Sequence, residues 1–233
     1  MGDIERMYEK LERTIALAAG EQGEDPEENI WLRCAIARAR RENLDDRRIE
    51  AAVDRGAGRT DEPTLQSATY DGYGPRDVAV FVRAITEDPL RTREELSELF
   101  EEHGGSLGED GSVAWQFDQR GLVLVEAASV GDEDDFMLDV IEMGGDEIGD
   151  PLYGDEDDRE TVYRVYCEGD GLLSLADALD EHGYDVWDVQ WVREPTQRIG
   201  LESEDVRRFL SFNESLNARP DVQDVYSNWT SAR

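Results

Sequence analysis

The first stretch of this chain that could carry chemistry is glycine-rich and lies at residues 103–115, "HGGSLGEDGSVAW". A phosphate-binding loop of the G-x-x-x-x-G-K-[ST] type uses a lysine and leads from a strand into a helix. This stretch has no basic residue, carries Glu109 and Asp110, and leads from a helical pattern into a strand pattern. We therefore expect no phosphate site here. We expect the glycines to permit a helix cap and tight turns that bring Val113, Trp115 and Phe117 into a sheet.

The histidines and cysteines of the chain also have structural explanations. His103 and His182, the only two histidines, each precede a glycine at the end of an expected helix, where a protonated imidazole interacts well with the helix dipole. No motif supplies a nucleophile or a second base beside them. Cys34 and Cys167 lack a C-x-x-C partner and are expected to be small buried residues.

Acidic clusters such as "DEDDFMLDVIEMGGDE" lack the spacing of a calcium-binding loop, and a solvated surface explains them better. We therefore predict no catalytic residue, no metal site and no cofactor. An enzyme with a site between two domains remains a third alternative for the function.

The composition indicates a folded protein adapted to salt. The chain has 57 Asp and Glu residues against 24 Lys and Arg, a net charge of -33, and Lys10 is its single lysine. Apolar residues recur in periodic patterns along the chain, which is unlike an acidic disordered protein. Surface carboxylates hold water and cations, so we expect a halophilic protein whose acidity reflects its solvent more than its partner.

Neither a membrane span nor a signal peptide is expected. No apolar run reaches the length of about 18 residues that a span requires. The first residues, "MGDIERMYEK", are acidic and amphipathic, unlike a signal peptide. We expect a soluble, cytoplasmic protein that has no membrane partner.

Positive charge is concentrated in residues 1–60, which hold 11 basic and 14 acidic residues, whereas 61–233 hold 13 and 43. In the second expected helix, apolar residues share one arc at about 100° per residue and arginines occupy the other. Guanidinium groups pair with phosphate oxygens in a bidentate manner, so an arginine face suits a nucleic-acid backbone. The candidate contacts are Arg33, Arg38, Arg40 and Arg41 of this helix, with Arg47 and Arg48 of the next. The alternative, which stays open, is a solvated face that pairs with Glu27, Glu28, Glu42 and the acidic domains.

Three short helices are predicted within residues 1–60 and interpreted as a helical bundle. The first covers 4–19 and stops at Gly20. The second is predicted to begin at Asp25 as N-cap, with Pro26 in the first turn, and to reach about Asn43. The third covers 45–56.

Residues 61–127 are predicted to form an α+β domain after a linker at 56–64. "DVAVFVRAI" is expected to be a buried strand that follows the turn "DGYGP". Thr92 and Glu95 suggest a capping box that opens a helix. "SVAWQF" and "GLVLVEA" are predicted to be two strands.

A second α+β domain is predicted over 128–194, with two helix and strand pairs and an exposed loop at 144–158. Residues 195–233 supply a strand, a helix and a closing strand, too little for a core of their own. We expect them to dock onto 61–127, which makes 128–194 an inserted domain. The predicted fold class is α+β.

Several segments together resemble one family. "YDGYGPRDVAVFV", "HGGSLGEDGSVAWQF" and "DVQDVYSNW" occur in the order and spacing of the YebC/PmpR family, which includes the mitochondrial translational activator of cytochrome oxidase subunit I. "NIWLRCAIARARREN" and "IEAAVDRGAG" are similar to the helical domain of the family.

The resemblance implies three domains, no enzymatic activity, and a DNA-binding transcriptional regulator. The alternative is a translation factor that binds ribosomal or transfer RNA at the ribosome. Arg33, Arg38 and Arg40 fall where family members carry basic residues. Members usually begin with a basic segment containing a G-H-S-K-W-like motif, whereas this chain starts at about the first long helix.

Overall fold

The computed structural model describes residues 2–152 and 161–232. Its internal contacts divide the chain into two compact units. The first unit comprises 1–24, 43–118 and 194–233, and the second comprises 25–42 and 119–193.

Two helices of the first unit, α1 (Asp3–Gln22) and α3 (Asp46–Gly56), pack closely against each other. A Cβ atom on Gly56 would lie 2.2 Å from the carbonyl oxygen of Ala16 and 2.9 Å from the Cβ of Ala19. Small residues at this crossing therefore let the two helix backbones approach.

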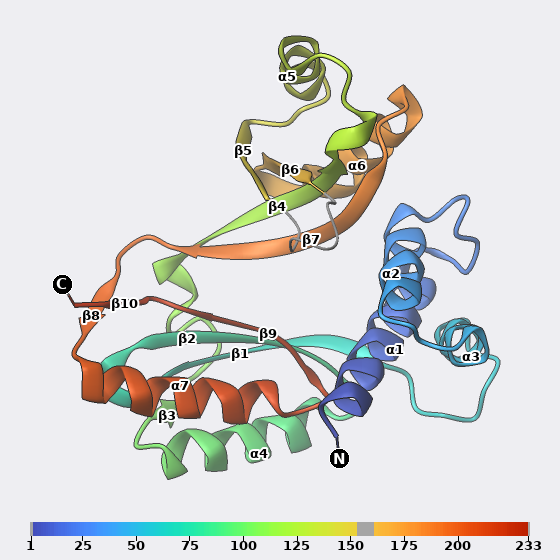
Figure 1. Cartoon of the computed structure of the whole chain (residues 1–233). Coiled ribbons are helices and arrows are strands. Elements are labelled where there is room, and N and C mark those ends of the chain that lie inside the picture. Colours follow the sequence, from blue (N-terminus) through green and yellow to red (C-terminus); the bar gives the residue numbers. More distant parts are fainter. Residues whose placement is uncertain (1, 153–160, 233) are drawn as a thin grey trace. The chain divides into compact units, whose positions relative to one another are not determined.

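The first unit also contains an antiparallel sheet in the order β3-β1-β2-β9, and two helices cover one of its faces (Figure 1). β2 is buried on both faces, because Val80 and Val82 pack under the helices and Phe81 packs against Phe117 on the other side. This double burial explains the uninterrupted apolar run predicted to be a strand. The strands are β1 (Gln66–Tyr73), β2 (Ala79–Thr86), β3 (Ser106–Leu107) and β9 (Val222–Ser227), and the helices are α4 (Pro89–Glu102) and α7 (Ser203–Asn217). A small parallel pair, β8 (Ile199–Leu201) and β10 (Trp229–Ser231), completes the unit.

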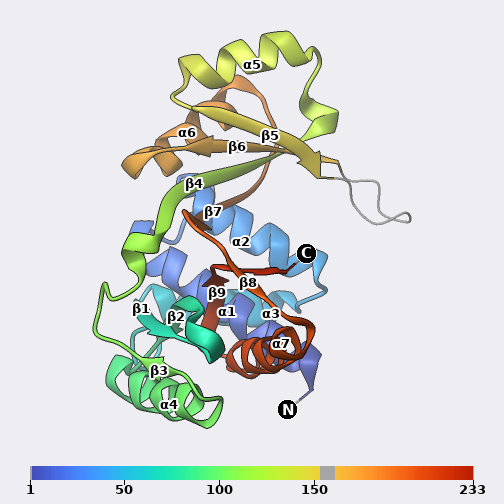
Figure 2. The same cartoon turned by 90° about the vertical axis from the view of Figure 1, so that its left-hand side faces the viewer.

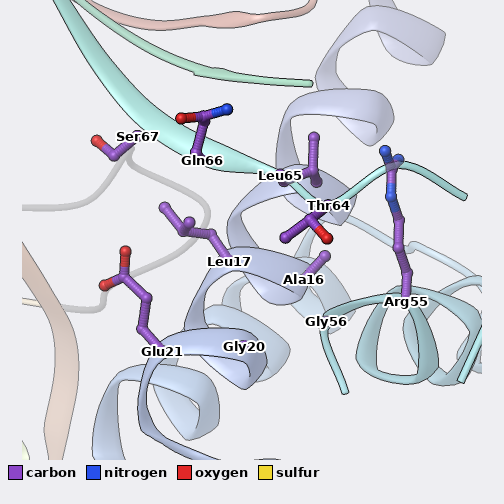
Figure 3. A pocket seen from close by; sticks show the side chains of 10 residues that line it. All are labelled: Ala16, Leu17, Gly20, Glu21, Arg55, Gly56, Thr64, Leu65, Gln66 and Ser67. Atoms are coloured by element: carbon purple, nitrogen blue, oxygen red, sulfur yellow. The ribbon is translucent and has the colours of Figure 1, made fainter. Parts of the chain in front are cut away.

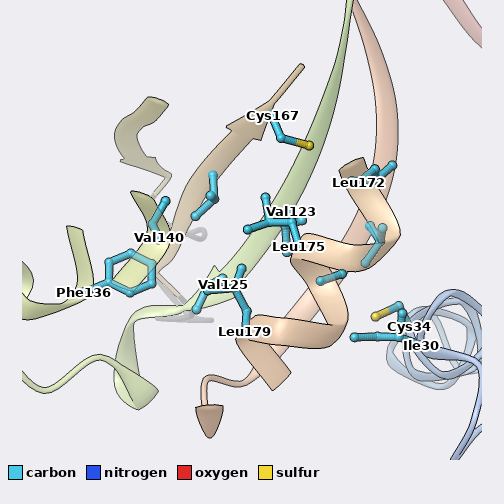
Figure 4. Close-up of a cluster of buried hydrophobic side chains, with 13 residues drawn as sticks. Ile30, Cys34, Val123, Val125, Phe136, Val140, Cys167, Leu172, Leu175 and Leu179 are labelled. Carbon is cyan, nitrogen blue, oxygen red and sulfur yellow. The ribbon is translucent and has the colours of Figure 1, made fainter. Parts of the chain in front are cut away.

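The second unit is built on a sheet in the order β5-β6-β4-β7, and Figure 2 shows β5, β6 and β4 side by side. Leu175 and Leu179 of one helix pack over Val123 and Val125 of the sheet (Figure 4). The strands are β4 (Phe117–Glu126), β5 (Glu147–Leu152), β6 (Val162–Cys167) and β7 (Val186–Pro195). The helices are α2 (Ile30–Arg41), α5 (Glu133–Glu142) and α6 (Leu172–His182).

Helix α2 contributes to the core of the second unit. Ile30 and Cys34 belong to its buried cluster and lie beside α6 (Figure 4). The helix thus packs with residues far along the sequence, whereas α1 and α3 pack with each other. The predicted division into 1–60, 61–127 with 195–233, and 128–194 differs from this grouping by contacts and stays a prediction.

Two of the predicted helix starts, at Asp25 and at Thr92, were wrong. Asp25 caps only a turn, since its carboxylate accepts from the N–H of Glu27, and α2 begins at Ile30 with Asn29 as its N-cap. Similarly, α4 begins at Pro89, and Asp88 accepts from the N–H groups of Leu90 and Arg91. Thr92 is instead a buried residue inside α4.

The predicted turn "DGYGP" is in large part the end of β1, a strand that the sequence interpretation missed. A Cβ atom on Gly72 would lie 2.6 Å from a ring carbon of Phe100 and 2.7 Å from the carbonyl oxygen of Ser106. Close packing against α4 and β3, rather than a turn, accounts for this glycine.

Three further expectations need correction. Residues 114–116 form a 3-10 helix, and β4 runs through 117–126 as one strand. Of the three residues expected to enter a sheet, only Phe117 lies in a strand; Val113 is buried in a turn, and Trp115 is 73% exposed. The expected loop at 144–158 contains β5, and its last part, 153–158, falls outside the described residues. The predicted mixture of an N-terminal helical region with α+β sheets is confirmed.

Candidate nucleic-acid interface

Helix α2 presents four of the six candidate arginines. Its N-terminus is fixed by the buried Asn29, whose side-chain oxygen accepts from the N–H of Leu32 at 2.9 Å. Ile30, Leu32, Cys34, Ala35 and Ala39 are buried. The predicted apolar arc of Trp31, Leu32, Ala35, Ile36 and Ala39 is therefore buried in part, because Trp31 and Ile36 are only half-buried while Ile30 and Cys34 join the core.

Arg33 and Arg38 form ion pairs within the second unit. An Nη atom of Arg33 lies 2.6 Å from a carboxylate oxygen of Asp180 on α6. Arg38 approaches Asp188 of β7 at 3.6 Å, and its side chain stays 56% exposed. Arg33 thus joins α2 to α6, while Arg38 keeps most of its side-chain surface in solvent.

Arg41 lies on an aromatic residue that the sequence interpretation did not single out. Its guanidinium carbon is 3.6 Å from the centroid of the Trp187 ring, and an Nη atom donates to the Trp187 carbonyl at 3.3 Å. Arg40 and Arg41 are both exposed. Arg38, Arg40 and Arg41 all lie in the last turn of α2, where positive charge also favours the helix dipole.

The two arginines of α3 belong to the first unit and behave differently from each other. Arg48 pairs with Glu5 at 2.9 Å and with Glu12, and its guanidinium lies 5.2 Å from the ring of Tyr8. The hydrogen bonds that this guanidinium donates to Glu12 and Glu5 raise its pKa above the ordinary value. Arg47 is exposed, and its side chain makes no ion pair with any residue that the structure describes. Arg48 therefore holds α1 to α3, whereas Arg47 faces solvent.

The glycine-rich segment is held in place by Asp71 of β1, a residue that sequence interpretation missed. The carboxylate of Asp71 is 2% exposed and accepts from the N–H groups of Val113 and Ala114 at 3.1 and 3.0 Å. A Cβ atom on Gly105 would lie 2.4 Å from the carbonyl oxygen of Tyr73. The segment thus lies against the backbone of β1 and its extension, which agrees with a structural role for its glycines.

The histidines and cysteines occupy the predicted places. His103 is the C-cap residue of α4, and His182 ends α6, with its Nε2 atom 3.2 Å from Asp139. Cys34 and Cys167 are both buried. Burial, followed by the negative charge of Asp188, raises the pKa of the Cys34 thiol to about 12. This thiol is therefore protonated near neutral pH and a poor nucleophile.

A pocket of about 360 Å³ opens in the first unit between α1, the end of α3 and the start of β1 (Figure 3). Ala16 and Leu17 of α1 are among the residues that line it, and its charged groups are Glu21 and Arg55. Arg55 already pairs with Glu62 at 3.2 Å and with Glu87 at 2.5 Å. The guanidinium is thus engaged by the protein itself rather than presented to a ligand.

Within residues 2–152 and 161–232, no group of three or more His, Cys, Asp or Glu side chains is arranged to hold a metal ion. The helices in the same residues are all too short or too polar to cross a bilayer.

Comparison with protein families gives two matches that together span nearly the whole chain. Residues 5–59 match the model described as the TACO1/YebC protein N-terminal domain. Residues 65–229 match the model of the TACO1/YebC second and third domain.

Individual relatives agree with these matches. A probable transcriptional regulatory protein of Dictyoglomus turgidum is 34% identical over 96% of this chain and 87% of its own length. One from Thermotoga maritima is 35% identical over 96% of this chain and 85% of its own length. The crystal structure of a conserved hypothetical protein from Aquifex aeolicus superposes with a TM-score of 0.76 at 29% identity, over 98% of this chain and 91% of that one.

Proposed function

We propose that this chain, which belongs to the TACO1/YebC family, regulates gene expression by binding DNA through the arginines of α2. The named relatives are probable transcriptional regulatory proteins, and regulation rather than catalysis is what their names describe. A nucleic acid is the partner that such a name implies.

The observation that carries the proposal is the exposure of Arg38, Arg40 and Arg41 in one helical turn. These three guanidinium groups stand out in a chain of net charge -33, which would otherwise repel a polyanion. Close contact is essential in a salt-rich solvent, because the Debye length falls to about 3 Å at about 1 M salt. Guanidinium groups that pair directly with phosphate oxygens meet that requirement.

The remaining candidates have different roles in this proposal. Arg33 orients α2 through Asp180, and Arg48 orients α3 through Glu5 and Glu12. Arg47 is the candidate contact of the first unit, because its side chain is exposed.

A second candidate function is a translation factor that binds ribosomal or transfer RNA. The observation that favours it is the stack of Arg41 on Trp187 at 3.6 Å. Unpaired RNA bases stack on aromatic rings and on guanidinium planes, whereas duplex DNA keeps its bases inside the helix. Such a stacked pair beside further arginines suits single-stranded RNA.

Binding of the full chain to duplex DNA, to single-stranded RNA and to ribosomes across a salt series tests both functions. For the leading proposal, DNA binding falls as salt rises, and Arg38→Gln, Arg40→Gln and Arg41→Gln together reduce the slope of log K against log salt by about 0.9 per lost phosphate contact. The matched control is Arg207→Gln with Arg208→Gln on α7, where both residues are exposed.

The outcomes separate the two functions. If the wild-type chain sediments with ribosomes, the triple variant does not, and the wild type binds no DNA at any salt concentration, the result supports the translation factor. The same result rules out the DNA-binding regulator. Binding that is equal in the triple variant and the wild type removes the α2 surface from both.

A further inference from the structure

Helix α5 carries large apolar side chains on its outer face. Met137, Leu138 and Ile141 are 44%, 62% and 65% exposed. Phe136 and Val140, on the opposite side of the same helix, are buried in the core of the second unit. Residues three and four positions apart lie on one face of a helix, so Ile141 lies beside both Met137 and Leu138. We call these three residues the α5 patch.

The α5 patch is unusual within this molecule. Other large apolar residues that are exposed in the described part of the chain include Ile4, Leu90 and Leu210, each on a different helix. Single exposed apolar residues are normal on protein surfaces, whereas adjacent ones mark interaction sites. Concentrated salting-out salts also strengthen apolar association, so an exposed apolar patch binds a partner more strongly in such a solvent.

Carboxylates lie at both ends of the patch. Glu133, Asp134 and Asp135 form the first turn of α5, and Glu142 ends it. The helix dipole explains acidic residues in a first turn, but it disfavours a carboxylate at the C-terminal end. Stability of the helix therefore does not account for Glu142, and the patch is bounded by negative charge on either side.

We propose that the α5 patch docks a basic amphipathic segment of a partner protein, whose apolar side chains cover Met137, Leu138 and Ile141. Charge complementarity selects this occupant, since lysines or arginines flanking its apolar face would meet Glu133, Asp134 and Glu142. A second copy of this chain would bring the same carboxylates together. A nucleic acid would be repelled by them and offers no matching apolar face.

The test uses the full chain and a synthetic helical peptide of about 18 residues, with leucines along one face and lysines elsewhere. A second peptide keeps the leucines and replaces the lysines by glutamates. Fluorescence anisotropy of labelled peptide measures Kd at about 0.15 M and about 1 M KCl. The lysine peptide is expected to bind in both solutions, more tightly than the glutamate peptide.

Two sets of variants locate the site. Leu138→Ser with Ile141→Ser is expected to raise the Kd at least about tenfold. Leu90→Ser with Leu210→Ser removes exposed leucines from α4 and α7 of the first unit and is expected to leave the Kd unchanged. Asp134→Asn with Glu142→Gln is expected to weaken binding at the lower salt concentration more than at the higher one.

Three results would overturn the proposal. The lysine peptide fails to bind, it binds the Leu138→Ser, Ile141→Ser variant as tightly as the wild type, or the glutamate peptide binds equally well. A dimer in sedimentation experiments that this variant abolishes would make a second copy the occupant instead. Circular dichroism of each variant confirms that a lost interaction is not a lost fold.

Discussion

Asp71 accounts for the position of the glycine-rich segment through one buried carboxylate. Its carboxylate accepts hydrogen bonds from the backbone N–H groups of Val113 and Ala114. Because Asp71 is buried, water cannot take its place as the acceptor. Asp71→Ala would leave both donors unsatisfied. We expect it to lower the free energy of unfolding by about 2 to 4 kcal/mol, measured in urea.

Asp118 provides the matched control for this prediction, because it is an exposed residue of β4. We expect Asp118→Ala to change the free energy of unfolding by less than about 0.5 kcal/mol. Equal effects of the two substitutions would mean that the carboxylate of Asp71 is not what holds the segment.

The thiol of Cys34 gives a prediction about pH. Its pKa is raised to about 12, whereas a thiol in an unfolded chain ionises near pH 8.5. The native state therefore keeps its proton while the unfolded state loses it, so the contribution of Cys34 to stability is lost as pH rises from about 8.5 towards 12.

Urea unfolding across this pH range measures the loss of stability, and a chromogenic thiol reagent checks the burial behind it in a Cys167→Ser variant, where Cys34 is the remaining cysteine. Native protein at about pH 8.5 is expected to react only as fast as it unfolds, and protein in denaturant at once. Rapid labelling of the native protein, with a half-maximal rate near pH 8.5, would contradict the burial of Cys34.

At the scale of elements, the attachment of α2 to α6 separates the structural role of Arg33 from a binding role. The pair with Asp180 is about one third exposed on each side. A double-mutant cycle of Arg33→Gln and Asp180→Asn is expected to give a coupling energy of about 0.5 to 1 kcal/mol in urea unfolding.

The same cycle in nucleic-acid binding is expected to show that Asp180→Asn weakens binding slightly, because α2 loses orientation. A stronger effect of Arg33→Gln than of the Arg38, Arg40 and Arg41 triple variant would make Arg33 itself the principal contact.

Local sequence predicted the elements that local physics decides. The apolar run of β2, the helix end at His103 and the buried arc of α2 follow from periodicity and caps. Gly72 was misread because its reason is the ring of Phe100. Thr92 was mistaken for a helix cap because the partner of its hydroxyl is distant in sequence. The hydroxyl donates to Asp221, near the C-terminal end of the chain, at 2.9 Å.

The candidate site divides in the same way. Periodicity placed the arginines of α2 opposite its core side. It could not supply Asp180 or Trp187, since the latter is 146 residues from Arg41. Trp187 and Trp191, four residues apart in the last strand expected in the second α+β domain, were the one signal for Trp187. Aromatic residues are common in any half-buried strand.

For the whole molecule, the net charge of -33 predicts a strong response to salt. Repulsion among surface carboxylates destabilises the compact state, and salt shortens its range from about 10 Å at about 0.1 M to about 3 Å at about 1 M. The Tm is therefore expected to rise with KCl over this range, as measured by differential scanning calorimetry.

Sucrose, which stabilises folded proteins without screening charge, is the control for that experiment. If electrostatic repulsion dominates, KCl raises the Tm steeply at low concentration, where sucrose has little effect. A Tm that falls with KCl would mean that the ion pairs of the surface outweigh their repulsion.

The packing of α2 has a practical consequence for dissecting this protein. The chain leaves the first unit after residue 24, gives one helix to the second, and returns at residue 43. Deleting the first sixty residues would therefore also strip Ile30 and Cys34 from a core built mainly of residues beyond 120. Truncations or fusions that remove this segment would therefore reduce solubility and binding at the same time. Point substitutions in α2 keep the effect on binding separate from the effect on solubility.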